Sequence, residues 1–367
     1  AVSRTVTVRS SDDDGSVAVN FGRLVASKPT STTRSMKVAN HGTAAVTYSI
    51  SGSQLNPLPG VSVSVAPDQL TVAPGEIKTV DVTLSLDPAK LGAPAAGPLT
   101  PTIQSELPNL WLNEAAGYLQ LEDAAGAQSL RLPFYGVVRA ASEQTVATPI
   151  GCSNNNGGLL LFPLVGDSSH PAPVLSVFEL GVVDDADEAS ATDAATALAD
   201  VRAIGAASSY ATTDDFEAVK VHFAVTHQGD WVTPGYSNFS IPNIAIDSDL
   251  DGKADYTLRA ETLGNTSVLV ATGYRLEDNN RLPNRHVINM AHPSEHDTAP
   301  LHNNVIVLSA FASEIGLEKD HTSFAYLAFS RTQFANQQET KWVTYDLAGR
   351  AVDTTRFAPQ VGRPLFG

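Results

Sequence analysis

The chain has 367 residues, of which 43% are hydrophobic and 17% charged, so it is not a disordered polymer and is long enough for two globular domains. Its formal net charge of −16 argues against nucleic acid and anionic membranes as partners, because basic faces bind both. Cys152 is the only cysteine, which excludes an internal disulfide, and no apolar run approaches the ~20 residues of a membrane span.

The first part of the chain alternates short strand-like runs with turn sequences. A leading strand is expected within residues 1–9. Turns rich in Pro, Gly and Asn then separate seven further runs, at 17–21, 35–39, 46–50, 61–65, 80–86, 117–121 and 130–138. This spacing predicts an antiparallel Greek-key sandwich, the architecture of immunoglobulin-like domains. The Pro-rich stretch 94–108 is expected to be a long surface loop.

Residues 140–158 lose the alternation and are rich in Ser, Thr, Asn and Gly, which places the domain boundary here. We therefore expect a first domain over 1–145 and a second over 146–367. Because the sequence begins at Ala1 rather than at a methionine, we also expect it to be a processed piece of a larger protein.

The second part is expected to be a larger, jelly-roll-like β-sandwich, so that the whole chain is all-β. A Gly-Asp-Trp turn at 229–231 precedes a predicted strand over 239–246, and 184–200 is expected to be an acidic loop with one helical turn. The segment 309–317 predicts one short helix, because Ser309 can cap it and Gly316 can end it. The other expected strands are 159–165, 174–180, 201–207, 219–226, 256–260, 267–274, 286–290, 305–308, 324–329 and 342–345.

An acidic loop between two of these strands is the first candidate site. Asp247, Asp249 and Asp251 stand at loop positions one, three and five, and Gly252 follows at position six, as at the start of an EF-hand calcium loop. Lys253 would contribute its backbone carbonyl and Asp255 would stand at position nine. Position twelve is Leu258 instead of a bidentate Glu, and strands flank the loop, which excludes a true EF-hand. Both a weak structural calcium site and a solvated acidic turn remain open.

A histidine-rich segment and a pair of aromatic residues are further candidates for a catalytic or binding site. His292, Glu295 and His296 have the H-x-x-E-H spacing of inverted zinc peptidases, but Pro293 and Pro300 leave less than two helical turns, so a polar surface loop is expected. Trp231 and Tyr236 could stack against a sugar or pack inside the domain.

No arrangement of residues in the sequence indicates a nucleophile. The chain has no G-x-S-x-G motif, and Cys152 has no nearby histidine. The tripeptide His41-Gly42-Thr43 resembles the surroundings of a subtilase histidine, but strand-like residues follow it where a helix belongs. We expect no catalytic residue in this chain.

Two long segments carry a family resemblance. Residues 61–84 and 117–138, the latter ending in LPFYGVV, resemble the fibronectin-type-III-like domain that follows the catalytic domain of bacterial subtilisin-like serine peptidases. GDWVTPG, DSDLDGKADY, HNNVIVLSAFASEIGL and KWVTYD are similar to the C-terminal region of the same peptidases.

The resemblance implies a secreted or cell-surface protein and a non-catalytic role. This chain would space, stabilise or help to position substrate for a catalytic domain of the same polypeptide, whose triad is not among these residues. Its other partners would be a protein substrate or a surface glycan. The alternative is a carbohydrate- or cell-surface-binding module.

Overall fold

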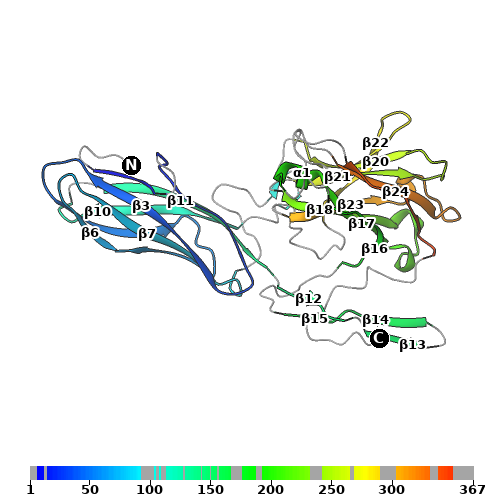
Figure 1. Ribbon diagram of the computed structural model, residues 1–367, viewed down its shortest axis with the longest axis horizontal. Coiled ribbons are helices and arrows are strands. Elements are labelled where there is room, and N and C mark those ends of the chain that lie inside the picture. The colour runs from blue at the N-terminus through cyan, green and yellow to red at the C-terminus, as the bar shows by residue number, and fades with distance from the viewer. Residues whose placement is uncertain are drawn as a thin grey trace. The chain divides into compact units, whose positions relative to one another are not determined.

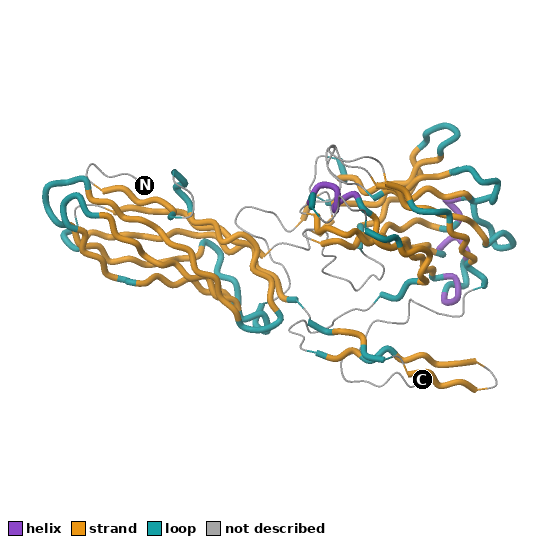
Figure 2. Tube along the Cα trace, viewed as in Figure 1, coloured by secondary structure: helices purple, strands orange, loops and turns teal. Residues whose placement is uncertain are grey.

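The computed structural model falls into two compact units, comprising residues 1–102 with 112–173 and residues 103–111 with 174–367 (Figures 1 and 2). The expected domain boundary at residue 145 stays a prediction. The structure describes residues 6–11, 15–91, 103–104, 107–108, 113–126, 129–141, 143–148, 150–154, 157–166, 176–186, 192–231, 242–264, 268–289, 303–330 and 338–349.

The first unit contains a sandwich of two sheets. One sheet has the strand order β1-β3-β7-β5 and the other β2-β11-β10-β4-β6, with β2 parallel to β11 and the remaining pairs antiparallel. The strands are β1 (Val6–Ser10), β2 (Val19–Ala26), β3 (Thr30–Asn40), β4 (Val46–Gln54), β5 (Val61–Ala66), β6 (Gln69–Val72), β7 (Ile77–Leu86), β10 (Asn113–Asp123) and β11 (Ser129–Ala140).

The core of this sandwich follows from period-two alternation. In β7 every second residue from Val80 to Leu86 is buried, while the residues between them are partly or fully exposed. Phe21 and Phe134, from neighbouring strands, meet edge to face with ring centroids 6.3 Å apart. The first unit therefore holds its own apolar core, as the sequence predicts.

Short two-stranded ladders form apart from the main sheets. They are β8 (Ile103–Gln104) with β9 (Leu107–Pro108), β12 (Thr145–Val146) with β15 (Leu164–Val165), and β13 (Ile150–Asn154) with β14 (Gly157–Leu161). The segment 140–158, expected to lack strands, thus contains two of them and part of a third.

The second unit is also a sandwich. Its sheets have the strand orders β16-β17-β18-β23 and β22-β21-β20-β19-β24-β25, and β26 pairs with β24. The elements are β16 (Glu179–Val183), α1 (Ala194–Ala199), β17 (Val201–Ser208), η2 (Tyr210–Thr212), η3 (Phe216–Ala218), β18 (Lys220–Trp231), β19 (Asn243–Asp247), β20 (Tyr256–Thr262), β21 (Leu269–Arg275), β22 (Arg281–Val287), β23 (Asn303–Phe311), η4 (Ser313–Ile315), β24 (Ser323–Ser330), β25 (Gln338–Glu339) and β26 (Val343–Asp346).

Aromatic side chains from both sheets fill the centre of the second unit. The Phe223 ring lies 5.9 Å from that of Phe324 and 5.2 Å from that of Tyr326, and all three are buried. Tyr345 of β26 packs against Phe324 at 5.6 Å. The predicted all-β class with two β-sandwiches is confirmed. Of the helices in the described ranges, none has the length and apolar character needed to span a bilayer.

The predicted Gly-Asp-Trp turn is wrong. Gly229 to Trp231 are the last residues of β18, which continues to pair with β23 after a register shift between Thr226 and Trp231. A Cβ added at Gly229 would lie 3.0 Å from the Cβ of Ala197 in α1. The glycine therefore permits close packing of the helix against the strand rather than a turn.

The helix predicted over 309–317 is also wrong. β23 runs on to Phe311, because Ile306, Leu308 and Ala310 alternate into the core, and only the 3-10 turn η4 follows it. Gly316 ends that turn with a φ of 81°. The strand predicted over 239–246 begins at Asn243 within the described residues, and the strand predicted at 286 begins at Arg281.

Candidate metal centre

The acidic loop joins two adjacent antiparallel strands of the second unit. β19 and β20 pair up to Ile246 and Tyr256, and the N–H of Asp255 donates to the Ile246 carbonyl at 2.7 Å, which closes the loop. Leu250 and Gly252 have φ values of 62° and 88°. These two left-handed residues turn the chain sharply enough to bring its aspartates back toward the strand ends.

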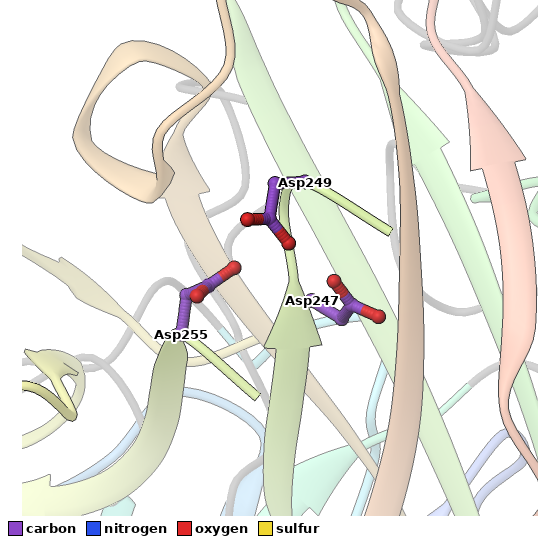
Figure 3. Close-up of side chains that lie close together, drawn as sticks. All are labelled: Asp247, Asp249 and Asp255. Atoms are coloured by element: carbon purple, nitrogen blue, oxygen red, sulfur yellow. The ribbon is translucent and has the colours of Figure 1, made fainter. Parts of the chain in front are cut away.

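Three of the predicted ligands converge. Asp247, Asp249 and Asp255 each offer a carboxylate oxygen, and these oxygens lie within 4.8 Å of one another (Figure 3). Asp247 is buried, Asp255 half-buried and Asp249 exposed. Such a group of negative charges is self-repulsive at neutral pH unless a cation lies among it.

Backbone amides hold the buried carboxylate in place. Oδ1 of Asp247 accepts from the N–H of Asp251 at 3.1 Å, and Oδ2 accepts from the N–H of Gly252 at 2.8 Å. The side chain at position one therefore organises the turn itself, and its carboxylate is fixed before any ion arrives.

Ser248 orients the third carboxylate. Its backbone N–H and its hydroxyl both donate to Oδ2 of Asp255 at 2.8 Å. A Cβ added at Gly316 would come within 2.9 Å of the Ser248 hydroxyl oxygen and 3.1 Å of the Tyr256 ring. Neither the role of Ser248 nor the contact of Gly316 with it was predicted from the sequence, and the local signal for Ser248 is its position between two of the aspartates.

Asp251, another predicted ligand, does not join this group, and the backbone carbonyl of Lys253 stays a predicted ligand. Asp251 accepts from the backbone N–H of Lys253 at 2.8 Å, and its other carboxylate oxygen lies 3.4 Å from the Lys253 ammonium. The lysine side chain is exposed, so this ion pair is weak. Asp251 is a partner of Lys253 here, whereas the convergent set consists of Asp247, Asp249 and Asp255.

The donor set suits a hard divalent cation. All three side chains offer oxygen, which Ca²⁺ prefers, and a doubly charged ion would offset most of their summed negative charge. Further oxygen ligands would have to come from the loop backbone or water, because Leu258 of β20 is buried in the core where an EF-hand has its Glu. The residues present fit a weak calcium site.

The other residues that the sequence suggests as site residues are not placed at this centre by the described part of the structure. Trp231 is the last residue of β18, and its side chain lies outside the described residues, as do Tyr236, His292, Glu295 and His296. His41 is an exposed residue whose Nε2 lies 3.0 Å from the Thr7 hydroxyl. Its neighbour Gly42 donates its N–H to the side chain of Asn40, so the His41 tripeptide forms a local turn.

Sequence reasoning also missed a buried serine–histidine pair. Nδ1 of His222 lies 2.7 Å from the hydroxyl oxygen of Ser309, across the paired strands β18 and β23. His222 is 4% exposed and Ser309 is 3% exposed. Burial, with smaller contributions from Lys220 and His286, lowers the pKa of His222 to about 4. A nucleophile must reach its substrate, and this hydroxyl is covered.

No family model matches the chain, and no curated protein matches it. Among solved structures, a FixG-related protein from Vibrio parahaemolyticus is 16% identical, with 36% of this chain and 94% of that chain covered and a TM-score of 0.23. PapD-like domain 7 of human CEP192 is 15% identical, with 38% and 88% covered and a TM-score of 0.24. The VesB protease of Vibrio cholerae is 15% identical, with 37% and 32% covered and a TM-score of 0.21. At these scores the similarities carry no argument about function.

Proposed function

We propose that this chain is a non-catalytic, calcium-stabilised accessory region of a secreted subtilisin-like serine peptidase. It would space or stabilise the catalytic domain of the same polypeptide, or help to position its substrate. The sequence resemblance of residues 61–84 and 117–138 supports this role, and those residues form β5 to β7, β10 and β11 of the first sandwich. A region that holds another domain in place needs rigid, independently packed units, and both units have apolar cores of their own.

The convergence of Asp247, Asp249 and Asp255 is the observation that carries the calcium part of the proposal. A cation bound among these carboxylates removes their mutual repulsion in the native hairpin and has no equivalent site in the unfolded chain. Calcium therefore raises stability by mass action. Without a bidentate Glu we expect a dissociation constant of roughly 10⁻⁴ M, the range of weak extracellular sites.

A thermal titration tests this role for calcium. The chelator-treated chain is expected to melt at a higher temperature as calcium is added, and the double substitution Asp249→Asn with Asp255→Asn is expected to abolish the increase. Asp278→Asn is the matched control, because Asp278 also accepts a backbone N–H in a hairpin turn, from Asn280 at 3.0 Å. It should keep the full calcium response. An equal response in the double variant would contradict the proposed site.

The non-catalytic role has its own test. The intact chain is expected to give no hydrolysis of casein or of a fluorogenic peptide that a serine-directed inhibitor blocks. Reproducible turnover sensitive to that inhibitor would contradict the accessory role, whatever the outcome of the calcium titration.

A further inference from the structure

One edge of the second sandwich is closed by side chains rather than by a strand ladder. β22 ends the larger sheet and β23 ends the smaller one. Beyond β22, Asn289 accepts the N–H of Val307 at 2.6 Å through Oδ1 and donates its own N–H to the Val307 carbonyl at 3.0 Å. At the other end, the side-chain amide of Asn284 donates to Glu314 at 2.7 Å. We call this contact between 281–289 and 303–315 the seam.

Three basic side chains lie together at the seam, His286 within it and Lys220 and His222 on the adjoining strand β18. Lys220 and His222 are two residues apart on β18, and the register places Phe311 and Ser309 of β23 opposite them. The His286 ring of β22 packs edge-on against Phe311 with centroids 4.9 Å apart, and the Lys220 ammonium lies 5.3 Å from the centre of the same ring. The imidazole of His286 and the ammonium of Lys220 thus both lie against the Phe311 ring.

Neither histidine is placed to carry a positive charge. His222 is buried against Ser309, and Nε2 of His286 is buried without a hydrogen-bond partner. The charge of Lys220 acts on both rings. The residues of β17 nearest to His222, Ala207 and Ser208, are uncharged. Among the described residues, the carboxylate at the seam is that of Glu314 in η4, and one of its oxygens accepts a hydrogen bond from Asn284. Arg285, next to His286 in β22, is exposed.

We propose that the seam is a pH-sensitive latch. It is closed while His222 and His286 are neutral, and it opens when both become protonated beside Lys220, which detaches β22 and the 288–289 turn from the edge of β23. The latch uses none of the calcium-loop residues, so its test is independent of the tests of the proposed function. An opened seam would expose the N–H and carbonyl of Val307 and the carbonyl of Val305, which Asn289 now covers.

The expected response is large. Burial is the main cause that lowers the pKa of both rings to about 4, with Lys220 adding to it. In an open seam the rings would regain ordinary values near ~6.5, so acid favours the open state. Between pH 7 and pH 4.5 each ring is expected to raise the ratio of open to closed seam by up to about 60-fold.

Hydrogen–deuterium exchange on the full chain tests the latch. Rates at pH 7 and pH 4.5 are compared after correction for intrinsic exchange, in peptides covering 281–289 and 303–311. We expect a rise of at least about tenfold at pH 4.5 in these peptides, and little change in peptides from the first unit. Unchanged exchange in both seam peptides would overturn the proposal.

Variants separate the latch from general acid sensitivity. In the double variant His222→Asn and His286→Phe, Asn can still bond Ser309 and Phe can still pack on Phe311, so the acid-induced rise should disappear. His321→Gln is the control, since His321 is an exposed histidine of the same unit and the response should persist. The same rise in the double variant would overturn the proposal, because the buried His227 would then be the group responsible.

Lys220→Met provides a second test that does not depend on removing a buried ring. Without the ammonium, the pKa of each histidine in the closed seam moves up toward its open-state value, so the difference in exchange between pH 7 and pH 4.5 should shrink. An undiminished or larger difference would contradict the arrangement of charges on which the latch depends.

Discussion

Asn289 pairs with Val307 as a strand residue would, although it lies beyond the end of β22 and has a left-handed φ of 57°. Its backbone N–H and its side-chain oxygen satisfy the carbonyl and the N–H of Val307, and its amide nitrogen donates to the Val305 carbonyl at 3.3 Å. One asparagine therefore occupies the place of a neighbouring strand along the outer edge of β23. Edge strands left uncovered tend to pair with other chains.

We predict that Asn289→Ala lowers the free energy of unfolding of the second unit by ~1–3 kcal/mol, because it removes the side-chain partners of the Val307 N–H and the Val305 carbonyl. Asn279→Ala is the matched control, since Asn279 also has a left-handed φ, of 54°, but is exposed in a turn. Urea denaturation measures both variants. Equal losses of stability in the two variants would show that the effect comes from the left-handed backbone alone and would contradict a stabilising role of Asn289 at the edge of β23.

A second prediction concerns Gly316, which packs against Ser248 of the acidic loop. Gly316→Ala places a Cβ within 2.9 Å of the Ser248 hydroxyl oxygen and strains a left-handed residue. We expect a loss of ~1–3 kcal/mol in stability and a weakened calcium response, because Ser248 orients Asp255.

Gly264→Ala is the control for that experiment. Gly264 has a φ of 58°, but a Cβ added there would meet no atom within 4 Å. It should lower stability through backbone strain and leave the calcium response intact. If both variants lose the calcium response equally, the contact between Gly316 and Ser248 does not support the site.

The pH dependence of stability is a third prediction. Burial lowers the pKa of His222, His227 and His286 to about 4, whereas the unfolded chain has histidines near ~6.5. Between pH 4 and pH 6.5 the unfolded chain binds more protons than the folded chain. The contribution of these histidines to the free energy of unfolding is therefore fully present above pH 6.5 and is lost as the pH drops toward 4. Each fully buried ring contributes a slope of up to ~1.4 kcal/mol per pH unit, and the half-buried His286 contributes less.

Urea midpoints of the second unit's transition between pH 7 and pH 4.5 measure this slope. The variant His222→Asn should reduce this slope by the amount that corresponds to about one proton, while His321→Gln should leave the slope unchanged. A midpoint of the wild-type chain that stays constant, or rises, as the pH falls through this window would contradict the neutral, buried state of these histidines.

The fold class was predictable because strands with one buried face alternate in sequence. The burial of every second residue in β7 is visible in the letters from Val80 to Leu86, and the acidic loop is visible because its turn residues and aspartates are local. Such signals need no knowledge of distant partners.

The failures concern residues whose role depends on segments far away in sequence. Gly229 suggested a turn, but it accommodates Ala197 of α1. The spacing at 309–317 suggested a helix, but Ser309 pairs with His222, 87 positions earlier. Contacts of this kind exist only after the sheets have formed. Within the acidic loop the miss is local, because residue spacing does not show which way a side chain turns. Asp251 turns toward Lys253, and Ser248 positions a different aspartate, Asp255.

Direct calcium binding to the intact, chelator-treated chain tests the central claim most directly. Isothermal titration calorimetry should show binding at the aspartate loop with a dissociation constant of roughly 10⁻⁴ M, absent from the Asp249→Asn and Asp255→Asn double variant and retained by Asp278→Asn. No measurable calcium binding by the wild-type chain, or binding that the double variant retains in full, would contradict the account.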